Sequence, residues 1–485
     1  MTRVQLTTNE NWLYPELCDV VRLFLGDVPI SETEGDVHIF HTHADGGESW
    51  EETASDGEKT VLRRVPACRG GLAEKRTLKR AAKTAVFLLL REKLQSSPPW
   101  GSLTGIRPTR LMYEALEEGK SLAEAEERMK DEFFVSPEKA RLLSEIIEMQ
   151  RGLVFPPEDS FDLYIHIPFC VSRCSYCSFA SGEVGDGRLT EPYTQALIRE
   201  MEQSSPLMRQ LGLKLRAGYV GGGTPTAISC DQLRRILVSA QTLFPGAREW
   251  TVEAGRPDTI TEEKLSMLKS LGIGRISVNP QTFSDETLRR IGRAHSAEDT
   301  VRAYELARRM GFHHINMDLI AALPGEGIKE FEDTVNKVIA LSPESVTVHS
   351  LAIKRASRIH EQLTVAGDSH NQADALDADR MISFARERLS EGGWKPYYLY
   401  RQKYMAGNLE NVGYARPGYA CLYNIGNMEE TARVLAVGAG SITKWVFDRE
   451  RRIERAPNLR NIEEYIRRAD EMVARKRRII LGEKE

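Results

Sequence analysis

The pattern of apolar and polar positions along the chain changes near residue 160. From there to about residue 355, a short apolar or alternating run, a loop rich in glycine, proline or polar residues, and a helical stretch follow one another repeatedly. The runs predict strands at 162–167, 216–220, 249–254, 274–279, 314–320 and 345–352. The helical stretches lie near 193–211, 231–243, 261–271, 284–292, 297–310 and 328–340. Strands that alternate with helices at this spacing indicate βαβ units and a parallel sheet.

Six such units predict an α/β fold built as a barrel or partial barrel. No glycine fingerprint of a dinucleotide-binding Rossmann fold accompanies them, which favours the barrel architecture. In such barrels the active site is built from loops at the C-terminal ends of the strands. We therefore expect functional side chains directly after the predicted strands.

The segments on either side of the repeating units have a different character. The first part of the chain mixes strand-like pieces with helical patterns, at 20–27, 37–42, 73–94 and 137–153. After about residue 356 the alternation breaks down. The chain is therefore divided into an N-terminal α+β domain of unknown role (1–158), a partial (β/α)6 barrel (159–355) and a mostly helical C-terminal region that covers the barrel mouth (356–485).

Composition and charge describe a soluble globular protein. The 485 residues are 41% hydrophobic and 28% charged, with both signs interspersed and a formal net charge of -4, which argues against a general nucleic-acid binder. The basic run 449–478 carries acids at helical spacing, so a solvated helix face is favoured over an RNA-binding tail. Residues 1–17 contain no secretory signal, and the apolar run 85–90 is far too short to span a membrane. A cytoplasmic protein is expected.

Three of the seven cysteines are crowded behind the first predicted strand. Cys170, Cys174 and Cys177 have the spacing C-x3-C-x2-C. A disulfide framework is not expected from an odd number of cysteines in a reducing compartment, and a structural zinc site would need a fourth ligand. His166 could supply it, but its place on the preceding strand favours a hydrogen-bonded histidine behind the site.

An iron–sulfur cube fits a set of three cysteine ligands better than a zinc ion does. Three thiolates on a cluster of four irons leave one iron open, and a small molecule with an amine and a carboxylate could chelate it. The other cysteines are scattered and are interpreted as small buried or surface residues: Cys18, Cys68, Cys230 and Cys421.

Further polar residues follow the other strands. The stretch GGGTPT (221–226) ends the second strand, and glycines there let the backbone approach a ligand. Glu253 ends the third strand, Gln281 follows the fourth, and Asp318 lies in the fifth. A carboxylate in an apolar run either satisfies a structural hydrogen-bond requirement or binds a ligand, and the shared position at strand ends favours a ligand. Arg293 alone would be interpreted as a surface arginine.

The cysteine spacing, with Tyr176 just before the last cysteine, resembles the radical S-adenosylmethionine (SAM) superfamily. The stretch YIHIPFC (164–170) is similar to its oxygen-independent coproporphyrinogen III dehydrogenase branch. The stretches LTGIRPTR (103–110) and GNLENVGYARPG (407–418) narrow the resemblance to the HemZ subgroup. It covers roughly residues 161–355 and implies a radical-SAM partial barrel, a [4Fe-4S] cluster held by the three cysteines, and SAM, with two molecules expected.

The resemblance also implies roles for individual residues. Positions associated with the cluster-bound SAM or its surroundings are Tyr164, Gly222, Gly223, Thr224 and Glu253, with Tyr176 near the adenine. Positions associated with a second SAM are Gln281, Arg293, Asp318 and Ala352. The residues expected to act in catalysis are Tyr164, Glu253 and Arg293.

The implied reaction is the oxidative decarboxylation of propionate side chains. A low-potential donor such as flavodoxin or ferredoxin passes one electron to bound SAM, and the resulting 5'-deoxyadenosyl radical takes a hydrogen atom from a propionate β-carbon of coproporphyrinogen III. Loss of carbon dioxide and one electron leaves a vinyl group. A tetra-anionic substrate would need basic residues at the barrel mouth, and the candidates are Arg256, Lys354, Arg355, Arg401 and Arg416.

Two alternatives remain open. The first is a heme-binding or heme-trafficking protein that retains the cluster; that branch carries an H-N-x-x-Y-W signature, whereas residues 407–411 read GNLEN here. The second is a radical SAM enzyme that acts on heme, on RNA or on another substrate, and the mild acidity counts against RNA. The dehydrogenase interpretation is favoured.

Overall fold

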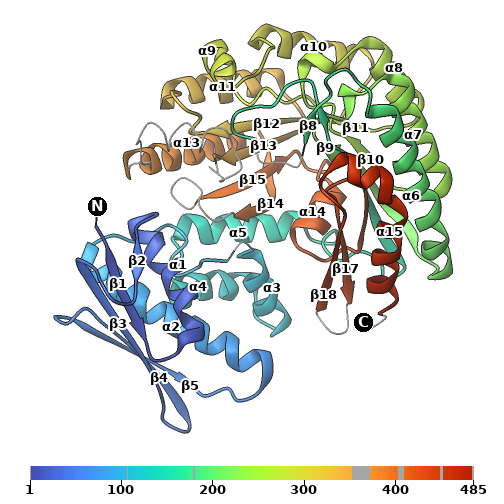
Figure 1. Ribbon diagram of the computed structural model, residues 1–485. Helices are drawn as coiled ribbons and strands as arrows, with labels where there is room; N and C mark the ends of the chain where they lie inside the picture. Colours follow the sequence, from blue (N-terminus) through green and yellow to red (C-terminus); the bar gives the residue numbers. More distant parts are fainter. Residues whose placement is uncertain are drawn as a thin grey trace. The chain divides into compact units, whose positions relative to one another are not determined.

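The computed structural model describes residues 2–105, 107–177, 181–351, 372–401, 409–447 and 452–482. The chain forms two compact units (Figure 1). The first comprises Met1–Ser144 with Arg401–Leu409, and the second comprises Glu145–Tyr400 with Glu410–Glu485. Helix α5 (Pro137–Met149) runs from the first unit into the second. The barrel segment and most of the C-terminal segment therefore belong to one unit.

The first unit is an α+β domain with one mixed sheet. Its strand order is β2-β1-β3-β4-β5, from the strands β1 (Val4–Thr8), β2 (Ile30–Ser31), β3 (Val37–Asp45), β4 (Ser49–Ser55) and β5 (Thr60–Pro66). Its helices are α1 (Tyr14–Leu25), α2 (Gly71–Leu94), α3 (Thr109–Glu117) and α4 (Leu122–Phe133), with the 3-10 turn η1 (Asn11–Leu13) before α1. Buried side chains of α1 and α2 form one core with those of β1, β3 and β4, so these helices cover one face of the sheet.

The strand expected at 20–27 is wrong, because this segment lies mainly in helix α1. Val20 and Val21 are β-branched and favour strands, but together with Leu17 they form an apolar face at helical spacing that is fully buried. Gly26, at φ 71°, ends the helix. Packing of the amphipathic face against α2 decides the conformation here.

The second unit contains the predicted parallel strands in their predicted order. They are β6 (Ser160–Ile167), β9 (Lys214–Gly222), β10 (Glu249–Val252), β11 (Arg275–Ser277), β12 (Ile315–Ala321) and β13 (Ser345–Ser350). Each pairs in parallel with the next. The connecting helices are α6 (Thr190–Gln210), α7 (Cys230–Leu243), α8 (Glu262–Ser270), α9 (Asp285–Arg290), α10 (Ala297–Arg309) and α11 (Ile328–Leu341), and they line the outer side of the curved sheet (Figure 1). The partial (β/α)6 barrel is thus confirmed.

The C-terminal region has more helical than strand residues, as expected, and it also adds five strands to the same sheet. Strands β15 (Glu410–Ala415) and β14 (Lys395–Arg401) continue the sheet beyond β13, and β16 (Val434–Val437), β17 (Ile442–Phe447) and β18 (Arg452–Pro457) continue it beyond β6. The region also holds helices α13 (Gln372–Glu391), α14 (Leu422–Met428) and α15 (Ile462–Leu481). Short apolar runs such as VLAV pair with strand edges that would otherwise expose unpaired backbone groups.

Strand β6, which leads into the cysteine loop, is held on both sides. Tyr164 pairs in register with Tyr219 of β9 and with Ala436 of β16. The buried carboxylate of Asp162 accepts two hydrogen bonds, at 2.9 and 2.5 Å, from Arg216. These contacts fix the position from which the cysteine loop departs.

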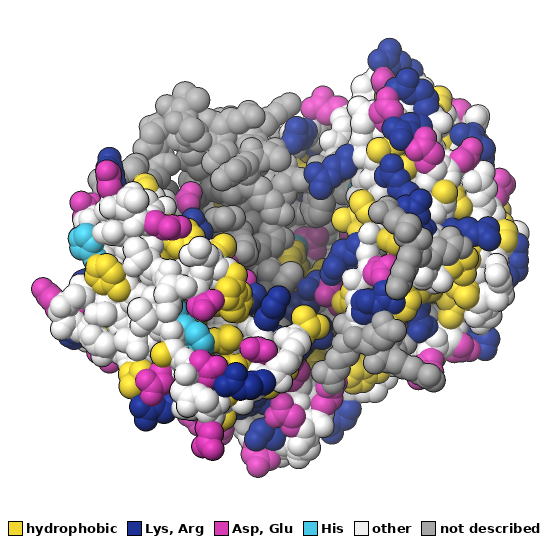
Figure 2. All heavy atoms as spheres, turned by 60° about the horizontal axis from the view of Figure 1, so that its bottom comes forward, with side chains coloured by type: hydrophobic (Ala, Val, Ile, Leu, Met, Phe, Trp, Pro, Cys, Tyr) yellow, Lys and Arg dark blue, Asp and Glu magenta, His cyan; other side chains and the backbone are white. Residues whose placement is uncertain are grey.

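Two surface properties limit the kinds of partner. Lysine, arginine and acidic side chains are interspersed on the face drawn in Figure 2, as the balanced composition suggests. None of the helices in the described ranges is long and apolar enough to cross a membrane.

Candidate functional site

The three-cysteine loop is fastened to the turn that follows α9. Cys170 ends the short strand β7 (Phe169–Cys170), which pairs with β8 (Gly182–Glu183). Further along, the backbone N–H of Ser175 donates to the carbonyl of Ile291 at 3.0 Å. The side chain of Cys174 is buried, and those of Cys170 and Cys177 are partly exposed. The loop is therefore anchored through its backbone, which leaves the sulfur atoms available as ligands.

Hydrogen-bond donors surround two of the sulfur atoms. The hydroxyl of Thr224 donates to Cys170 Sγ at 3.6 Å, and Arg256 Nη1 lies 3.9 Å from Cys174 Sγ. Arg256 is held in place by the carboxylate of Asp258 at 2.7 Å. Thiolate is the form of cysteine that binds metal.

The sulfur atoms suit a cluster better than a single ion. Within the described ranges, no group of three or more His, Cys, Asp or Glu side chains converges as the ligands of one metal ion would. A cube offers a separate iron to each thiolate, so the sulfur atoms need not meet at one point. The set of three thiols in an anchored loop fits such a group.

Three consecutive glycines leave room beside the cysteine loop. A Cβ at Gly221 would lie 2.7 Å from the carboxylate of Glu253, and one at Gly222 would lie 2.5 Å from the ring of His166. A Cβ at Gly223 would lie 3.0 Å from Cys170 Sγ. The GGG run is therefore required by close approach to the site, and Gly222 is also required by its φ of 114°.

Gly222→Ala is expected to destabilise the protein by about 1–3 kcal/mol beyond the change caused by Gly212→Ala. A Cβ at Gly212 (φ 66°) meets nothing within 4 Å, so the difference combines the collision with His166 and the greater backbone strain at Gly222 (φ 114°). Thermal unfolding of the two variants measures it. Adding His166→Ala to Gly222→Ala should recover part of the loss, and no recovery would show that backbone strain alone is responsible.

His166 is a neutral residue whose ring packs against Gly222. Its ring is buried, and burial lowers its pKa to about 4. The backbone carbonyl of His166 accepts a 2.7 Å hydrogen bond from Tyr193. The ring fills the space that Gly222 leaves open.

Glu253 lies at the end of β10 within a group of aromatic rings. The hydroxyl of Tyr219 donates to its Oε1 at 2.6 Å, and Tyr219 stacks on Tyr423 with ring centroids 4.4 Å apart. Tyr164 packs against both rings, with centroids 5.9 Å from Tyr423 and 6.2 Å from Tyr219. Burial raises the pKa of Tyr164, and the nearby carboxylate of Glu253 raises it further. These tyrosines therefore remain protonated donors.

The carboxyl of Glu253 titrates near neutrality. Burial raises its pKa to about 7, the Tyr219 hydrogen bond opposes this shift, and the negative charge of Asp318 adds to it. The Glu253 side chain lies among protein atoms, and part of its surface is exposed to solvent. A carboxyl of this kind is ready to ionise when a cationic or hydrogen-bond-donating ligand arrives.

A second polar group surrounds Asp318, which lies in the middle of β12. Asn279 donates to its Oδ2 at 2.8 Å, and Asn316 donates to its Oδ1 at 2.7 Å. The backbone of Gln281, at φ 65°, bridges to the same strand. His349 Nε2 lies 4.0 Å from Asp318 Oδ1. Asp318 is partly exposed, so its oxygens retain capacity to accept further hydrogen bonds.

Arg293 links the cysteine loop to the end of β11. Its Nη1 donates to the carbonyl of Asn279 at 2.9 Å and its Nη2 to the hydroxyl of Tyr176 at 3.0 Å. The guanidinium also interacts with the side chain of Cys174. Only 8% of Arg293 is exposed, so it is not the surface arginine that the sequence alone suggests.

The candidate site residues of the sequence analysis lie on one sheet edge and the adjacent loops, with one exception. Ala352 lies outside the described residues, as do Lys354 and Arg355. The other basic candidates have structural contacts: Arg416 stacks on Trp394 at 4.0 Å, and Arg401, in the first unit, donates to the carbonyl of Leu103 at 2.8 Å. Of the basic residues proposed for the barrel mouth that the structure describes, Arg256 is the one that contacts the cysteine loop.

Sequence reasoning missed four residues of the site. They are Tyr219, Asn279, Asn316 and Tyr423. Strand alternation could have found Tyr219, since it lies two positions before Gly221 and on the same face of β9. Asn316 has the same relation to Asp318. Tyr423 approaches from α14 far along the chain, and no local pattern indicates it.

Comparison with known proteins agrees with this geometry. Residues 164–338 match the radical SAM superfamily. The oxygen-independent coproporphyrinogen-III oxidase-like protein HemZ of Bacillus subtilis is 39% identical over 385 residues, which cover 77% of this chain and 76% of that protein. The heme chaperone HemW of the same organism is 38% identical over 194 residues, 39% of this chain and 50% of that protein.

A solved structure shares the fold. That of the coproporphyrinogen III oxidase HemN from Escherichia coli, a radical SAM enzyme, has a TM-score of 0.52 at 22% identity, covering 69% of this chain and 73% of that one. The fold and the three-thiol loop are those of a radical SAM protein. The chain belongs to the radical SAM superfamily and, within it, to the HemZ group of oxygen-independent coproporphyrinogen-III oxidase-like proteins. Its cofactors are a [4Fe-4S] cluster and SAM.

Proposed function

We propose that the protein oxidatively decarboxylates propionate side chains of coproporphyrinogen III in anaerobic heme and porphyrin biosynthesis. The observation that carries the proposal is the meeting of the three-thiol loop with two separate carboxylate groups, around Glu253 and around Asp318, at one sheet edge. The name of the Bacillus subtilis relative supports the choice of substrate.

The cysteines would hold the cluster by their thiolates: Cys170, Cys174 and Cys177. When bound, the cluster and SAM supply reductive cleavage of the sulfonium bond and, through it, hydrogen-atom abstraction. The electron would come from a low-potential donor such as flavodoxin or ferredoxin in the cytoplasm. The protein's own residues bind, orient and enclose the reactants.

Glu253 and the glycine run would bind the first SAM. The ionised carboxylate of Glu253 accepts hydrogen bonds from amino or hydroxyl groups, and Gly222 and Gly223 let the backbone approach His166 and the cysteine loop closely. Thr224 holds Cys170 by its hydroxyl, and Tyr164 supports Glu253 through the tyrosine stack. Tyr176 offers an aromatic face beside the cysteine loop for the adenine.

The group around Asp318 would bind the second SAM. Gln281 bridges to β12 beside Asp318, and Arg293 supplies a positive charge between this group and the cysteine loop. Ala352, the remaining candidate for this position, lies outside the described residues.

SAM affinity is expected to rise about tenfold from roughly pH 6 to pH 8, since the pKa of Glu253 is raised to about 7 and the ionised form is the acceptor. At the lower pH most of this carboxyl is protonated in the free protein, and ionisation on binding weakens the apparent affinity. Calorimetry of the cluster-loaded protein measures the profile. Glu253→Gln should bind SAM more weakly and lose this part of the pH dependence; an identical profile would exclude Glu253 as the acceptor.

The second candidate function is binding and trafficking of heme, without decarboxylation. It is favoured by the 38% identity to the heme chaperone HemW over 194 residues. The H-N-x-x-Y-W signature of that branch is absent from GNLEN, of which Gly407 and Asn408 lie outside the described residues. A third candidate, a radical SAM enzyme that acts on heme or another substrate, shares the same core.

Anaerobic turnover separates these candidates. The cluster-loaded protein is incubated with coproporphyrinogen III, SAM and a strong reductant, and the porphyrins are separated by chromatography, with heme titration in parallel. The proposal requires SAM consumption coupled to carbon dioxide release and vinyl formation. Tight heme binding with no decarboxylated product, under any reducing system that cleaves SAM, would overturn it in favour of trafficking.

A further inference from the structure

The first unit contains a basic pocket that the proposed reaction does not use. It has a volume of about 420 Å3 and lies between α2 and the loop that precedes α3. Its lining includes five cationic side chains of α2, which are Lys75, Arg76, Lys79, Arg80 and Lys83. These residues recur at helical spacing and form one stripe along the helix.

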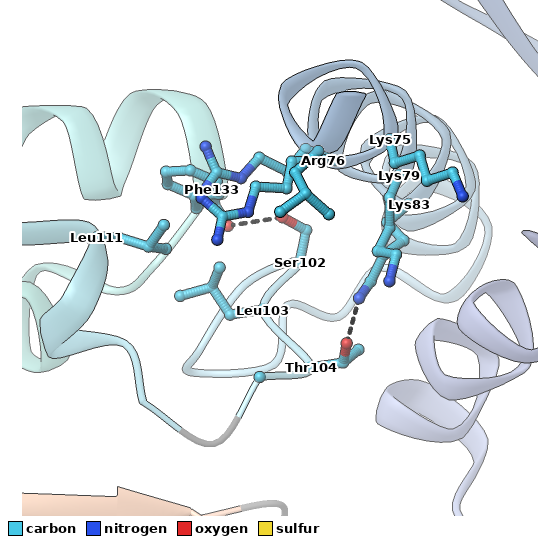
Figure 3. Close-up of a pocket in the computed structure, with 12 residues that line it drawn as sticks. Lys75, Arg76, Lys79, Lys83, Ser102, Leu103, Thr104, Leu111 and Phe133 are labelled. Atoms are coloured by element: carbon cyan, nitrogen blue, oxygen red, sulfur yellow. Dashed lines mark hydrogen bonds between the residues drawn. The ribbon is translucent and has the colours of Figure 1, made fainter. Parts of the chain in front are cut away.

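The opposite wall is the start of the LTGIRPTR stretch. Ser102, Leu103, Thr104 and Gly105 line the pocket. Figure 3 shows Arg76, Lys79 and Lys83 extending from α2 toward this loop. The amino group of Lys83 donates to the hydroxyl of Thr104. The sequence feature that marks the subgroup therefore forms part of a pocket in the first unit and not of the cysteine site.

The loop is held in a fixed shape. Gly101 has a φ of 56°, and a Cβ there would lie 1.9 Å from the carbonyl oxygen of Phe133, so no other residue fits. The backbone N–H of Ser102 donates to the same carbonyl at 2.9 Å. Arg401 donates to the carbonyl of Leu103 at 2.8 Å and lies over the ring of Trp100 at 5.2 Å. The wall is preformed, as ligand pockets usually are.

The positive charge of the pocket is only partly neutralised. Glu16 is shared by Lys79 at 2.6 Å and Lys83 at 3.1 Å. Glu114 is shared by Arg80 at 3.0 Å and Arg76 at 3.8 Å. Among the described residues, Glu16 and Glu114 thus pair with four of the five cations, and the charge of Asp19 also acts on Lys83. Burial lowers the pKa of Lys83, and the charge of Glu16 opposes this shift, so an arriving anion would further stabilise the charged form.

We propose that this pocket binds a small ligand bearing at least two oxyanion groups, either carboxylates or phosphates. Arginine and lysine side chains on one stripe can engage two such groups at once, and arginine binds each of them bidentately. Leu72, Leu103 and Leu111 provide apolar surface for the body of the ligand. The volume is within the range of small-molecule sites and far below what a folded macromolecule would occupy.

The test measures binding of two probes to the full-length, cluster-loaded protein. Pyrophosphate represents the phosphate source and coproporphyrin III the carboxylate source, with coproporphyrin III tetramethyl ester as the uncharged counterpart. At least one charged probe is expected to bind, more weakly as salt is raised, and the ester is expected not to bind this pocket.

The key variant is Arg76→Gln/Lys79→Gln, because Arg80 and Lys83 remain to pair with Glu114 and Glu16. It should weaken binding of the probe by about tenfold or more. The matched control, Lys59→Gln/Arg63→Gln, removes the same charge from β5 and the turn before it, outside the pocket lining, and should leave affinity unchanged.

A third variant is expected to increase the affinity for the probe. Glu114→Gln removes a carboxylate that competes for Arg76 and Arg80, so it should increase affinity several-fold. The proposal would be overturned if neither small probe binds, or if the pocket and control variants lose affinity equally. Binding of a long RNA alone would also overturn it. Decarboxylation by the Arg76→Gln/Lys79→Gln variant is measured in a separate assay. Failure of the pocket proposal is therefore distinguishable from failure of the proposed function.

Discussion

Cys170→Ala, Cys174→Ala and Cys177→Ala are each expected to abolish the [4Fe-4S] cluster of anaerobically reconstituted protein. Each removes one of the three thiolates that would bind an iron of the cluster. Iron content and visible absorption measure the loss. SAM cleavage should fall to background in the same variants, because the open iron is lost with the cluster.

Cys421→Ala is the control for these variants. Its thiol is buried 3.2 Å from the carboxylate of Glu249, and burial raises its pKa to about 12. Iron content should be unchanged in this variant. A protein that still holds its full iron after all three loop cysteines are replaced would contradict the assignment.

Arg293→Ala is expected to lower kcat/KM for decarboxylation by roughly a hundredfold while the cluster remains. The guanidinium makes charge-assisted hydrogen bonds to Asn279 and Tyr176 and so holds the end of β11 against the cysteine loop. Loss of two such bonds is worth about 3 kcal/mol or more, and a rate changes tenfold for about each 1.4 kcal/mol. Anaerobic product chromatography gives the rate.

Two further measurements separate positioning from cluster assembly. Arg293 also interacts with Cys174, so iron content must be determined alongside product. Arg289→Ala, on the exposed side of α9, is the matched control and should affect neither. Loss of iron in proportion to loss of product would mean that Arg293 serves the loop and not the reactants.

The strands and helices of the repeating units could be predicted closely because the residue types and the spacing of apolar positions indicated the same elements there. The strand expected at 162–167 is Ser160–Ile167, and the helix expected at 231–243 is Cys230–Leu243, begun by a Ser229 cap. The segment 20–27 failed because β-branched residues and helical spacing disagreed, and tertiary packing against α2 decided between them.

The candidate site also contains residues that could be predicted from the sequence and residues that could not. Glu253 and Asp318 were identifiable because a carboxylate in or directly after an apolar strand conflicts with burial unless it has partners. Tyr423 was not, because it reaches the site from α14. Arg293 was misjudged from local sequence since its burial depends on the cysteine loop folding over it.

The place of β6 inside the sheet has a consequence for the order of events during protein synthesis. Its neighbour on one side, β16, is Val434–Val437, so the ribosome makes it roughly a quarter of a minute to a minute after β6 at ordinary elongation rates. Throughout that interval the strand that carries YIHI is an open edge. Nascent chains halted before residue 434 should therefore keep this edge open and acquire no stable cluster.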